Sequence, residues 1–260
     1  MLLPPSPDPR RTDKAWQQVF TALQLHEHDF ALAPAFLKAT DFKLATGNLE
    51  PRIYCKQDTR ESRPQVFKDR NLFILPAKNG RYAIVQGEGY VDIPPVETTH
   101  EVYVSKLDFV LDTSLVGSSE MQHLDFAYAA SLVRTFLNDN TLVLTIRGRK
   151  YTPEFKFRVG PHDLQVESVQ TEVDAGYEGR NQVVLFEAKT GNTRNTIIRQ
   201  LYFPFRQWQQ HTTKQVLTVF FEKSGDSYSF WEFGFRDVLD YNSIYLLRSA
   251  RFHIHSKLTP

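Results

Sequence analysis

The sequence predicts an α/β fold with a central mixed β-sheet flanked by helices, and a smaller N-terminal part made of helices and a β-hairpin. One observation is the order of patterns after residue 118, where a helix precedes several strands, a second helix and further strands. Another is residues 182–189, which are apolar on both faces for most of their length, as in an interior strand covered on each side. A chain of 260 residues, 41% hydrophobic and 23% charged, is long and apolar enough to bury a real core.

Composition excludes several classes of protein. The formal net charge is +1, so a polyanionic partner has to be met by a local basic patch. Cys55 is the only cysteine, which excludes an internal disulfide and any multi-cysteine zinc site. The first residues lack the apolar stretch of a signal peptide, and no run approaches the roughly 18 apolar residues of a membrane span. We therefore expect a soluble cytoplasmic protein without a membrane partner.

The N-terminal part begins with a proline-rich tail. Four of the first nine residues are proline, so we expect residues 1–13 to be disordered. Beyond Lys14, apolar residues follow helical spacing at Trp16, Val19, Phe20 and Leu23. A second helix is predicted around Phe36 and Leu37, before the Gly47 turn and the helix-breaking Pro51.

Segment 51–81 is basic, with eight Lys and Arg against three Asp and Glu. Two short apolar runs, residues 71–75 and 82–85, lie on either side of Asn79-Gly80 and predict a β-hairpin. The basic residues form either a solvated surface or a patch that faces phosphates. The candidate DNA-binding residues are Arg52, Lys56, Arg60, Arg63, Lys68 and Arg70. Arginine reads guanine bidentately, so Arg60, Arg63 and Arg70 are better specificity candidates than Lys68.

Pro94 and Pro95 mark a linker over residues 93–101, which divides the chain into a part at 14–95 and a part at 96–260. An amphipathic helix of about five turns is expected next. Its apolar residues are Met121, Leu124, Tyr128, Leu132 and Phe136. Ser118 or Ser119 is its expected N-cap, and Glu120 lies in its first turn, where a carboxylate favours the helix dipole.

Strand patterns follow the helix. They cover residues 141–148, 154–160, 164–173 and 182–189, and a hairpin covers 216–235 with its turn at 224–226. A second helix is expected to begin near Asn192 and to carry Ile197, Ile198 and Leu201.

The end of the interior strand is charged. Glu187 and Lys189 lie on one strand face and are about 6.6 Å apart, so one small ion or phosphate can touch both. Asp174 precedes Glu187, and the turn between them contains Gly176 and Gly179. An antiparallel hairpin would bring Asp174 to the charged end. Two carboxylates and an ammonium at a sheet edge suit hydrolysis of a phosphodiester with Mg²⁺, which prefers hard oxygen ligands.

The alternative is that Glu187 and Lys189 form a structural ion pair. A second triplet in the chain allows a comparison with them. Glu154 and Lys156 have the same spacing, but they alternate with Phe155 and Phe157 along an amphipathic strand. That triplet is expected to lie on a solvated face. The later one is distinguished by the buried strand that leads into it.

The pattern Asp174…Glu187-Ala-Lys189 resembles the catalytic signature of the PD-(D/E)XK nuclease superfamily. The strings "VQTEVDAGYEG", "VVLFEAKTG" and "IIRQLYFPFRQW" resemble a group of bacterial type II restriction endonucleases. The resemblance extends to "EPRIYCKQDTRESRPQVFKDRNLFILPAKNGRY" and "SEMQHLDFAYA", within residues 14–245. The proline of the superfamily's name is absent before Asp174.

The resemblance implies a Mg²⁺-dependent, sequence-specific endonuclease of double-stranded DNA in the bacterial cytoplasm. Asp174 and Glu187 are then metal ligands and Lys189 is the catalytic lysine. Glu120 and Glu172 are candidates for a further ligand, and Gln200 is a candidate phosphate contact. Part 14–95 would recognise DNA and part 96–260 would cleave it.

Cleavage of both strands favours a homodimer on a palindromic site. A cognate DNA methyltransferase is implied without a stable complex. Two alternatives stay open: a structure-specific repair or junction-resolving nuclease of the same superfamily, and a non-catalytic DNA-binding regulator.

Overall fold

A seven-stranded mixed sheet forms the centre of the molecule in the computed structural model, which describes residues 8–97 and 101–255. The strand order is β5-β14-β13-β12-β10-β9-β6. The strands are β5 (Glu101–Val104), β14 (Ile244–His255), β13 (Ser227–Phe235), β12 (Gln215–Ser224), β10 (Gln182–Thr190), β9 (Gln170–Glu178) and β6 (Val143–Tyr151). Strand β10 pairs in parallel with β12 and antiparallel with β9, and β14 is parallel to β5. The predicted fold class is confirmed.

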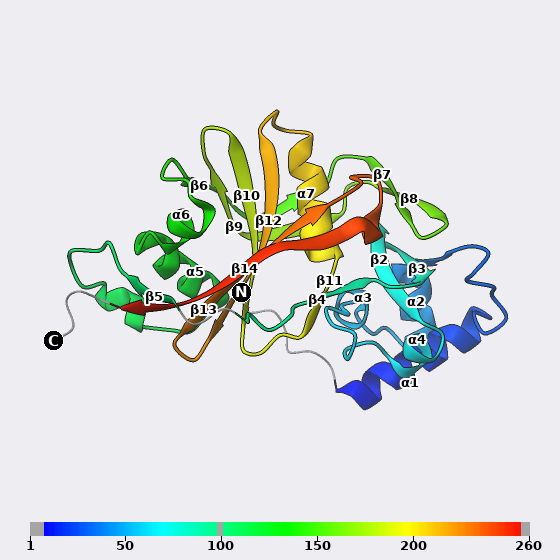
Figure 1. Cartoon of the computed structure of the whole chain (residues 1–260). Coiled ribbons are helices and arrows are strands. Elements are labelled where there is room, and N and C mark those ends of the chain that lie inside the picture. Colours follow the sequence, from blue (N-terminus) through cyan, green and yellow to red (C-terminus); the bar gives the residue numbers. More distant parts are fainter. Residues whose placement is uncertain (1–7, 98–100, 256–260) are drawn as a thin grey trace.

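Helices cover both faces of this sheet (Figure 1). Helices α5 (Glu120–Ala129) and α6 (Leu132–Leu137) pack on one face, and α7 (Arg199–Gln209) packs on the other. Along β10, Val183 and Leu185 belong to the core beneath α7, while Val184 and Phe186 belong to the core beneath α5 and α6. The interior strand, covered on both faces, is therefore confirmed.

The N-terminal part has its own apolar core. It comprises α1 (Pro9–Ala22), β1 (Ala35–Lys38), α2 (Ala39–Thr46), α3 (Pro51–Tyr54), α4 (Gln65–Asp69), β2 (Leu72–Lys78) and β3 (Arg81–Gln86). Its three strands form a sheet of order β1-β3-β2. Trp16 is fully buried and stacks edge-on against Phe42 and Phe67. The predicted hairpin is confirmed, with Gly80 at φ +71° in its turn.

Two expectations for this part are wrong. Phe36 and Leu37 lie in strand β1 and not in a helix, because the segment alternates buried and exposed side chains while pairing with β3. The expected tail also ends earlier than Lys14. Pro9 is the first residue of α1, where its fixed φ suits a helix start, and Asp8 accepts a hydrogen bond from the Arg10 amide. Residues 1–7 lie outside the described residues.

The expected five-turn helix is divided. Ser119 caps α5 as predicted, by accepting from the Gln122 amide at 3.2 Å. The helix ends at Ala129 because Ser131 adopts the left-handed conformation at φ +66°, and α6 then begins a new direction.

Two boundaries in the second part also differ from expectation. The strand expected at 164–173 is split into β8 (His162–Val166) and β9, with Ser168 at φ +53° between them. The helix expected from Asn192 begins only at Arg199, because residues 195–197 form strand β11 (Asn195–Ile197). This strand pairs with β4 (Tyr90–Asp92), a pairing partner that local sequence does not reveal.

Shorter elements complete the chain. They are β7 (Phe155–Val159), which pairs with β8, and the 3₁₀ turns η1 (Asp112–Leu115) and η2 (Tyr241–Ser243). Residues 93–97 have no regular structure, as the linker prediction expects, and Trp231 Nε1 donates to the Pro94 carbonyl at 2.8 Å. Ile93 and Val96 pack on the sheet beside Trp231. Among the described residues, no helix is long and apolar enough to cross a membrane.

Gly89 lies in the contact between the N-terminal and C-terminal parts, where it packs closely against Phe73. Its replacement tests how tightly this contact is packed. A Cβ at residue 89 would lie 2.3 Å from the ring of Phe73, which is fully buried in β2. The Gly89 carbonyl also accepts from Ile198 N and from the Tyr241 hydroxyl, so the backbone cannot move away freely. We expect Gly89→Ala to lower the free energy of unfolding by about 1–3 kcal/mol in urea titrations.

The double variant Gly89→Ala/Phe73→Leu supplies the control. If the clash is the cause, the two substitutions together cost less than the sum of their separate costs, because leucine removes the ring atoms. Simple additivity would show that Gly89 and Phe73 are not in steric conflict.

Candidate active site

The site lies where strands β9 and β10 separate. Their pairing stops at Phe186 and Ala175. On the other side of β9, Asp174 and Ala175 lie opposite a single residue of β6, so the strand contains a bulge. Because β9 turns away here, the Ala188 amide has no strand partner, and it donates instead to Asp174 Oδ2 at 2.7 Å. The side chain of Asp174 thus takes the place of a main-chain acceptor and is held against β10. The antiparallel pairing of β9 and β10 brings Asp174 to the charged end of β10, as predicted.

Glu187 is buried at the end of β10, with 8% of the residue exposed. Its Oε1 accepts from Gln200 Nε2 of α7 at 2.7 Å and from Lys189 Nζ. Gln200 is held in turn by the Thr196 hydroxyl at 2.7 Å. Burial raises the pKa of Glu187 to about 7, although the ammonium of Lys189 acts in the opposite direction. The carboxylate is therefore fixed in position, and the nearby positive charge of Lys189 does not fully compensate its burial.

Asp174 and Lys189 share this electrostatic environment. Burial raises the pKa of Asp174, against the Ala188 amide and the charge of Lys189, which lower it. Burial by itself would lower the pKa of Lys189, but the carboxylates around it, Glu187 foremost, raise it overall. Lys189 thus stays charged, and one ammonium balances at least two carboxylates.

The oxygen atoms at this point suit a hard divalent cation. Each of the two acids has one oxygen anchored by hydrogen bonds, while Asp174 Oδ1 and Glu187 Oε2 accept none within the described part of the chain. The Ala188 carbonyl is a third oxygen, and Lys189 Nζ contacts it at 3.1 Å. The ammonium thus contacts the anchored oxygen of Glu187 and one oxygen that a cation would use, the Ala188 carbonyl. Two carboxylates and a carbonyl, with waters, are a donor set that Mg²⁺ accepts.

The described residues contain no ready-made group of three or more His, Cys, Asp or Glu side chains spaced to hold a metal. The candidate set consequently depends on the main-chain carbonyl of Ala188 and on solvent.

Glu120 approaches the same site from the other side. It is the first residue of α5, and its charge interacts with those of Lys189 and Asp174. Burial raises the pKa of Glu120, whereas Lys189, Lys56 and the Thr190 amide lower it. Glu120 therefore lies close enough to contribute to the electrostatics of a bound cation, and its role as a ligand stays a prediction.

Glu172 has another partner. It is exposed and accepts from Arg149 Nε of β6 at 3.3 Å. Its charge also raises the pKa of Asp174, after the larger effect of burial, so the two carboxylates lie near enough to interact. The role of Glu172 as a further ligand stays a prediction.

Three arginines of the basic segment make contacts within the chain. Arg60 is bound to Glu88, Asp92 and the Tyr90 carbonyl, so a base contact by its guanidinium would have to replace them. Arg63 donates to the Leu72 and Arg60 carbonyls. Arg70 donates to the His26 carbonyl at 3.2 Å. These contacts indicate that each of the three arginines stabilises the fold. That they also bind DNA stays a prediction.

The remaining basic candidates are more exposed. Among the described residues, Arg52 is bound to Glu50 alone, and 82% of its side chain is exposed. Lys56 pairs with Asp58 at 3.3 Å, and Lys68 is exposed on α4.

Two further charged residues, Asp58 and Arg194, were not among the candidates from the sequence. Asp58 is one of the charges that raise the pKa of Glu187. Arg194 is exposed in the loop that follows Lys189, and none of the described residues binds its guanidinium. The sequence signal for Arg194 is its position five residues after Lys189. Asp58 carries no such signal, because only the tertiary fold brings it here.

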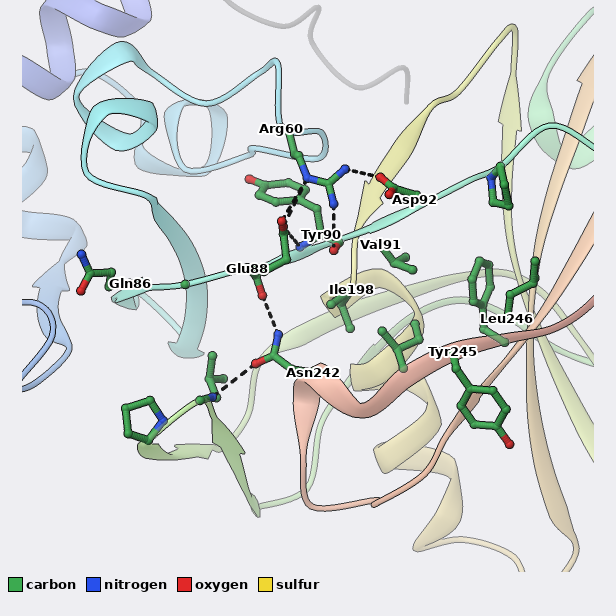
Figure 2. A pocket seen from close by; sticks show the side chains of 17 residues that line it. Arg60, Gln86, Glu88, Tyr90, Val91, Asp92, Ile198, Asn242, Tyr245 and Leu246 are labelled. Atoms are coloured by element: carbon green, nitrogen blue, oxygen red, sulfur yellow. Dashed lines mark hydrogen bonds and ion pairs between the residues drawn. The ribbon is translucent and has the colours of Figure 1, made fainter.

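A cavity of about 730 Å³ lies at the junction of the two parts, away from these acids. Figure 2 shows Arg60, Tyr90 and Asp92 on one side of it and Tyr245 and Leu246 on the other. Asn242 closes one end by donating to the Glu88 carbonyl at 2.6 Å. None of Asp174, Glu187 and Lys189 lines this cavity, so the candidate chemistry lies elsewhere.

Comparison with known proteins divides the chain into two matched segments. A family model described as "Domain of unknown function (DUF6997)" matches residues 85–253, and another, "Domain of unknown function (DUF6996)", matches residues 13–84. No curated protein and no solved structure matches the chain.

Binding of Mg²⁺ can be measured without any substrate. A ligand at 100 times its Kd stabilises the folded state by about 2.7 kcal/mol. At this chain length that corresponds to about 2–4 °C of melting temperature for each kcal/mol. We expect MgCl₂ to raise the melting temperature of the wild type and not that of Asp174→Asn.

Asparagine at 174 keeps an acceptor for the Ala188 amide while removing the buried charge. The metal-free variant should therefore be at least as stable as the wild type. An equal magnesium shift in Asp174→Asn and wild type would exclude this carboxylate as a ligand.

Proposed function

We propose that this chain, which belongs to the family described as a domain of unknown function (DUF6997), is a magnesium-dependent endonuclease that cleaves double-stranded DNA at a short defined sequence. The observation that carries the proposal is the convergence of Asp174, Glu187 and Lys189 at the point where β9 leaves β10. Each of the three reaches this point from a fixed backbone position.

The donor set favours phosphodiester hydrolysis among the reactions of hard cations. A bound Mg²⁺ would polarise the phosphoryl group and lower the pKa of a coordinated water. Asp174 and Glu187 would hold it through their free oxygens, together with the Ala188 carbonyl. In the reaction the water oxygen forms a bond to phosphorus, one P–O ester bond breaks, and the leaving oxygen takes up a proton.

Lys189 has two tasks in this scheme. Its ammonium lies beside Glu187 and the Ala188 carbonyl, next to where the phosphate would bind. There it orients the attacking water and stabilises the additional negative charge on the phosphoryl oxygens. Because the surrounding carboxylates keep it protonated, it acts as a cation and hydrogen-bond donor.

Sequence specificity is assigned to the N-terminal part together with the loop after β10. Arg52, Lys68 and Arg194 present exposed cationic groups, and exposed arginines can read base edges or phosphates. A homodimer would supply one site for each strand of a palindromic target.

Lys189→Ala is the decisive variant for the proposed activity. We expect wild type to cut a large DNA of known sequence into discrete fragments in about millimolar Mg²⁺, and Lys189→Ala to cut at least 10²- to 10³-fold more slowly, as when one transition-state donor is lost. The measurement is gel electrophoresis with sequencing of fragment ends. Lys156→Ala is the matched control, since Lys156 has the same spacing from Glu154 but lies exposed on β7.

The pattern of cleavage separates the alternatives. Cutting only at junctions or flaps would favour a structure-specific nuclease. Intact DNA under every metal and salt condition, with binding that persists in Asp174→Asn, would favour a non-catalytic DNA-binding protein.

Gln200 is expected to act through Glu187, because its amide anchors one oxygen of that carboxylate. Removal of such an orienting partner costs about 10- to 100-fold in metal affinity or activity. We therefore expect Gln200→Ala to require more Mg²⁺ for half-maximal cleavage, measured by magnesium titration. Gln210→Ala, at the exposed end of the same helix, should have the magnesium dependence of wild type.

A further inference from the structure

We propose that the catalytic site is shared between the two matched segments, with Lys56 of the N-terminal part binding the phosphate next to the cleaved bond. This inference rests on the proposed nuclease function. Lys56 is a positioning residue in this scheme, and Asp58 holds it in place before DNA binds.

Segment 58–61 is hydrogen-bonded directly to strand β11, which follows the loop after Lys189. The Asp58 carbonyl accepts from Ile197 N at 2.8 Å, and Arg60 N donates to Asn195 Oδ1 at 2.7 Å. Asn195 Nδ2 donates to Glu61 at 3.0 Å. Asn195 and Ile197 are both buried, so these bonds lie in an ordered contact.

The attached strand, β11, connects the two sides of the site. It follows the loop after Lys189 and precedes Gln200, which binds Glu187. The main chain of the N-terminal part is therefore fixed within a few residues of the metal-binding acids. Lys56 and Asp58 lie in the same stretch.

Two charge interactions place this stretch near the site. Burial raises the pKa of Glu187, and the charge of Asp58 adds to that rise. Burial raises the pKa of Glu120, and the charge of Lys56 acts in the opposite direction. Asp58 and Lys56 therefore each lie near enough to one of these carboxylates to interact with it, and the hydrogen bonds to β11 hold the stretch there.

Lys56 is free to change partner. Its ammonium is 3.3 Å from Asp58, and 46% of its side chain is exposed. Exposed ion pairs contribute at most about 1 kcal/mol, so a DNA phosphate can replace Asp58 at little cost. Asp58 does not lose all compensation in the exchange, because Arg199 lies 3.7 Å from its other oxygen.

Lys14 provides the comparison within the same part of the chain. It is an exposed lysine on α1, a helix that packs against α2 and α4, and no ion pair involving it occurs in the described part of the chain. Charge alone would make Lys56 and Lys14 equivalent. Their positions predict that only Lys56 affects the chemical step.

The experiment compares Lys56→Ala, Lys56→Arg and Lys14→Ala in the full-length protein. Single-turnover cleavage at saturating DNA and Mg²⁺ measures the chemical step, metal-free DNA binding measures affinity, and melting temperature measures folding. We expect Lys56→Ala to slow cleavage by about 10- to 100-fold with less than a threefold change in affinity. Lys56→Arg should recover most of the rate, and Lys14→Ala should cleave at the wild-type rate.

Failure of either proposal is recognisable. Absence of magnesium-dependent cleavage by wild type would overturn the nuclease function itself. Cleavage by wild type with equal rates for Lys56→Ala and Lys14→Ala would overturn only the shared site. A joint loss of rate and melting temperature in Lys56→Ala, not restored by arginine, would make Lys56 a structural residue and would also overturn it.

Discussion

The arrangement of the site depends on one constraint, the burial of β10 on both faces up to the residues that carry charge. An apolar strand fixed by two cores has little freedom, so Glu187, Ala188 and Lys189 emerge at a defined place. The cost is a buried carboxylate whose pKa is raised to about 7. Lys189 and Gln200 offset part of that cost, and a divalent cation would offset more. A site that is electrostatically incomplete on its own is what cation binding requires.

The separation of β9 from β10 is the second condition. Had the two strands stayed paired, the Ala188 amide would donate to a main-chain carbonyl and its own carbonyl would be engaged as well. The bulge at Asp174 and Ala175 ends the pairing at Phe186, two residues before Ala188. Asp174 then substitutes for the lost acceptor, and the Ala188 carbonyl becomes available. The bulge in β9 thus makes two of the three candidate metal ligands available, the Asp174 carboxylate and the Ala188 carbonyl.

Periodicity predicted the fold class, the interior strand and its charged end, because these follow from local alternation. It also separated the Glu187 triplet from that of Glu154, which lies on an amphipathic strand with one exposed face. It failed at Phe36 and Leu37, where the pairing partner β3 decides between helix and strand. It also missed the bulge in β9, the position of Asp58 and the pairing of β11 with β4. All of these depend on contacts between residues that are distant in sequence, which no local pattern encodes.

The contacts of β11 bear on how the two matched segments relate. The segments meet between residues 84 and 85, yet hydrogen bonds from Asp58, Arg60 and Glu61 hold a strand of the second segment. Linkers between independent domains run through exposed positions that few contacts cross. Here Gly89 is packed against Phe73, and its carbonyl binds Ile198, so the junction is part of a core. In the proposed nuclease, a movement of the N-terminal part on binding DNA would be transmitted through β11 to Gln200 and Glu187. Recognition and cleavage would in that scheme be coupled by the same few hydrogen bonds that hold the two segments together.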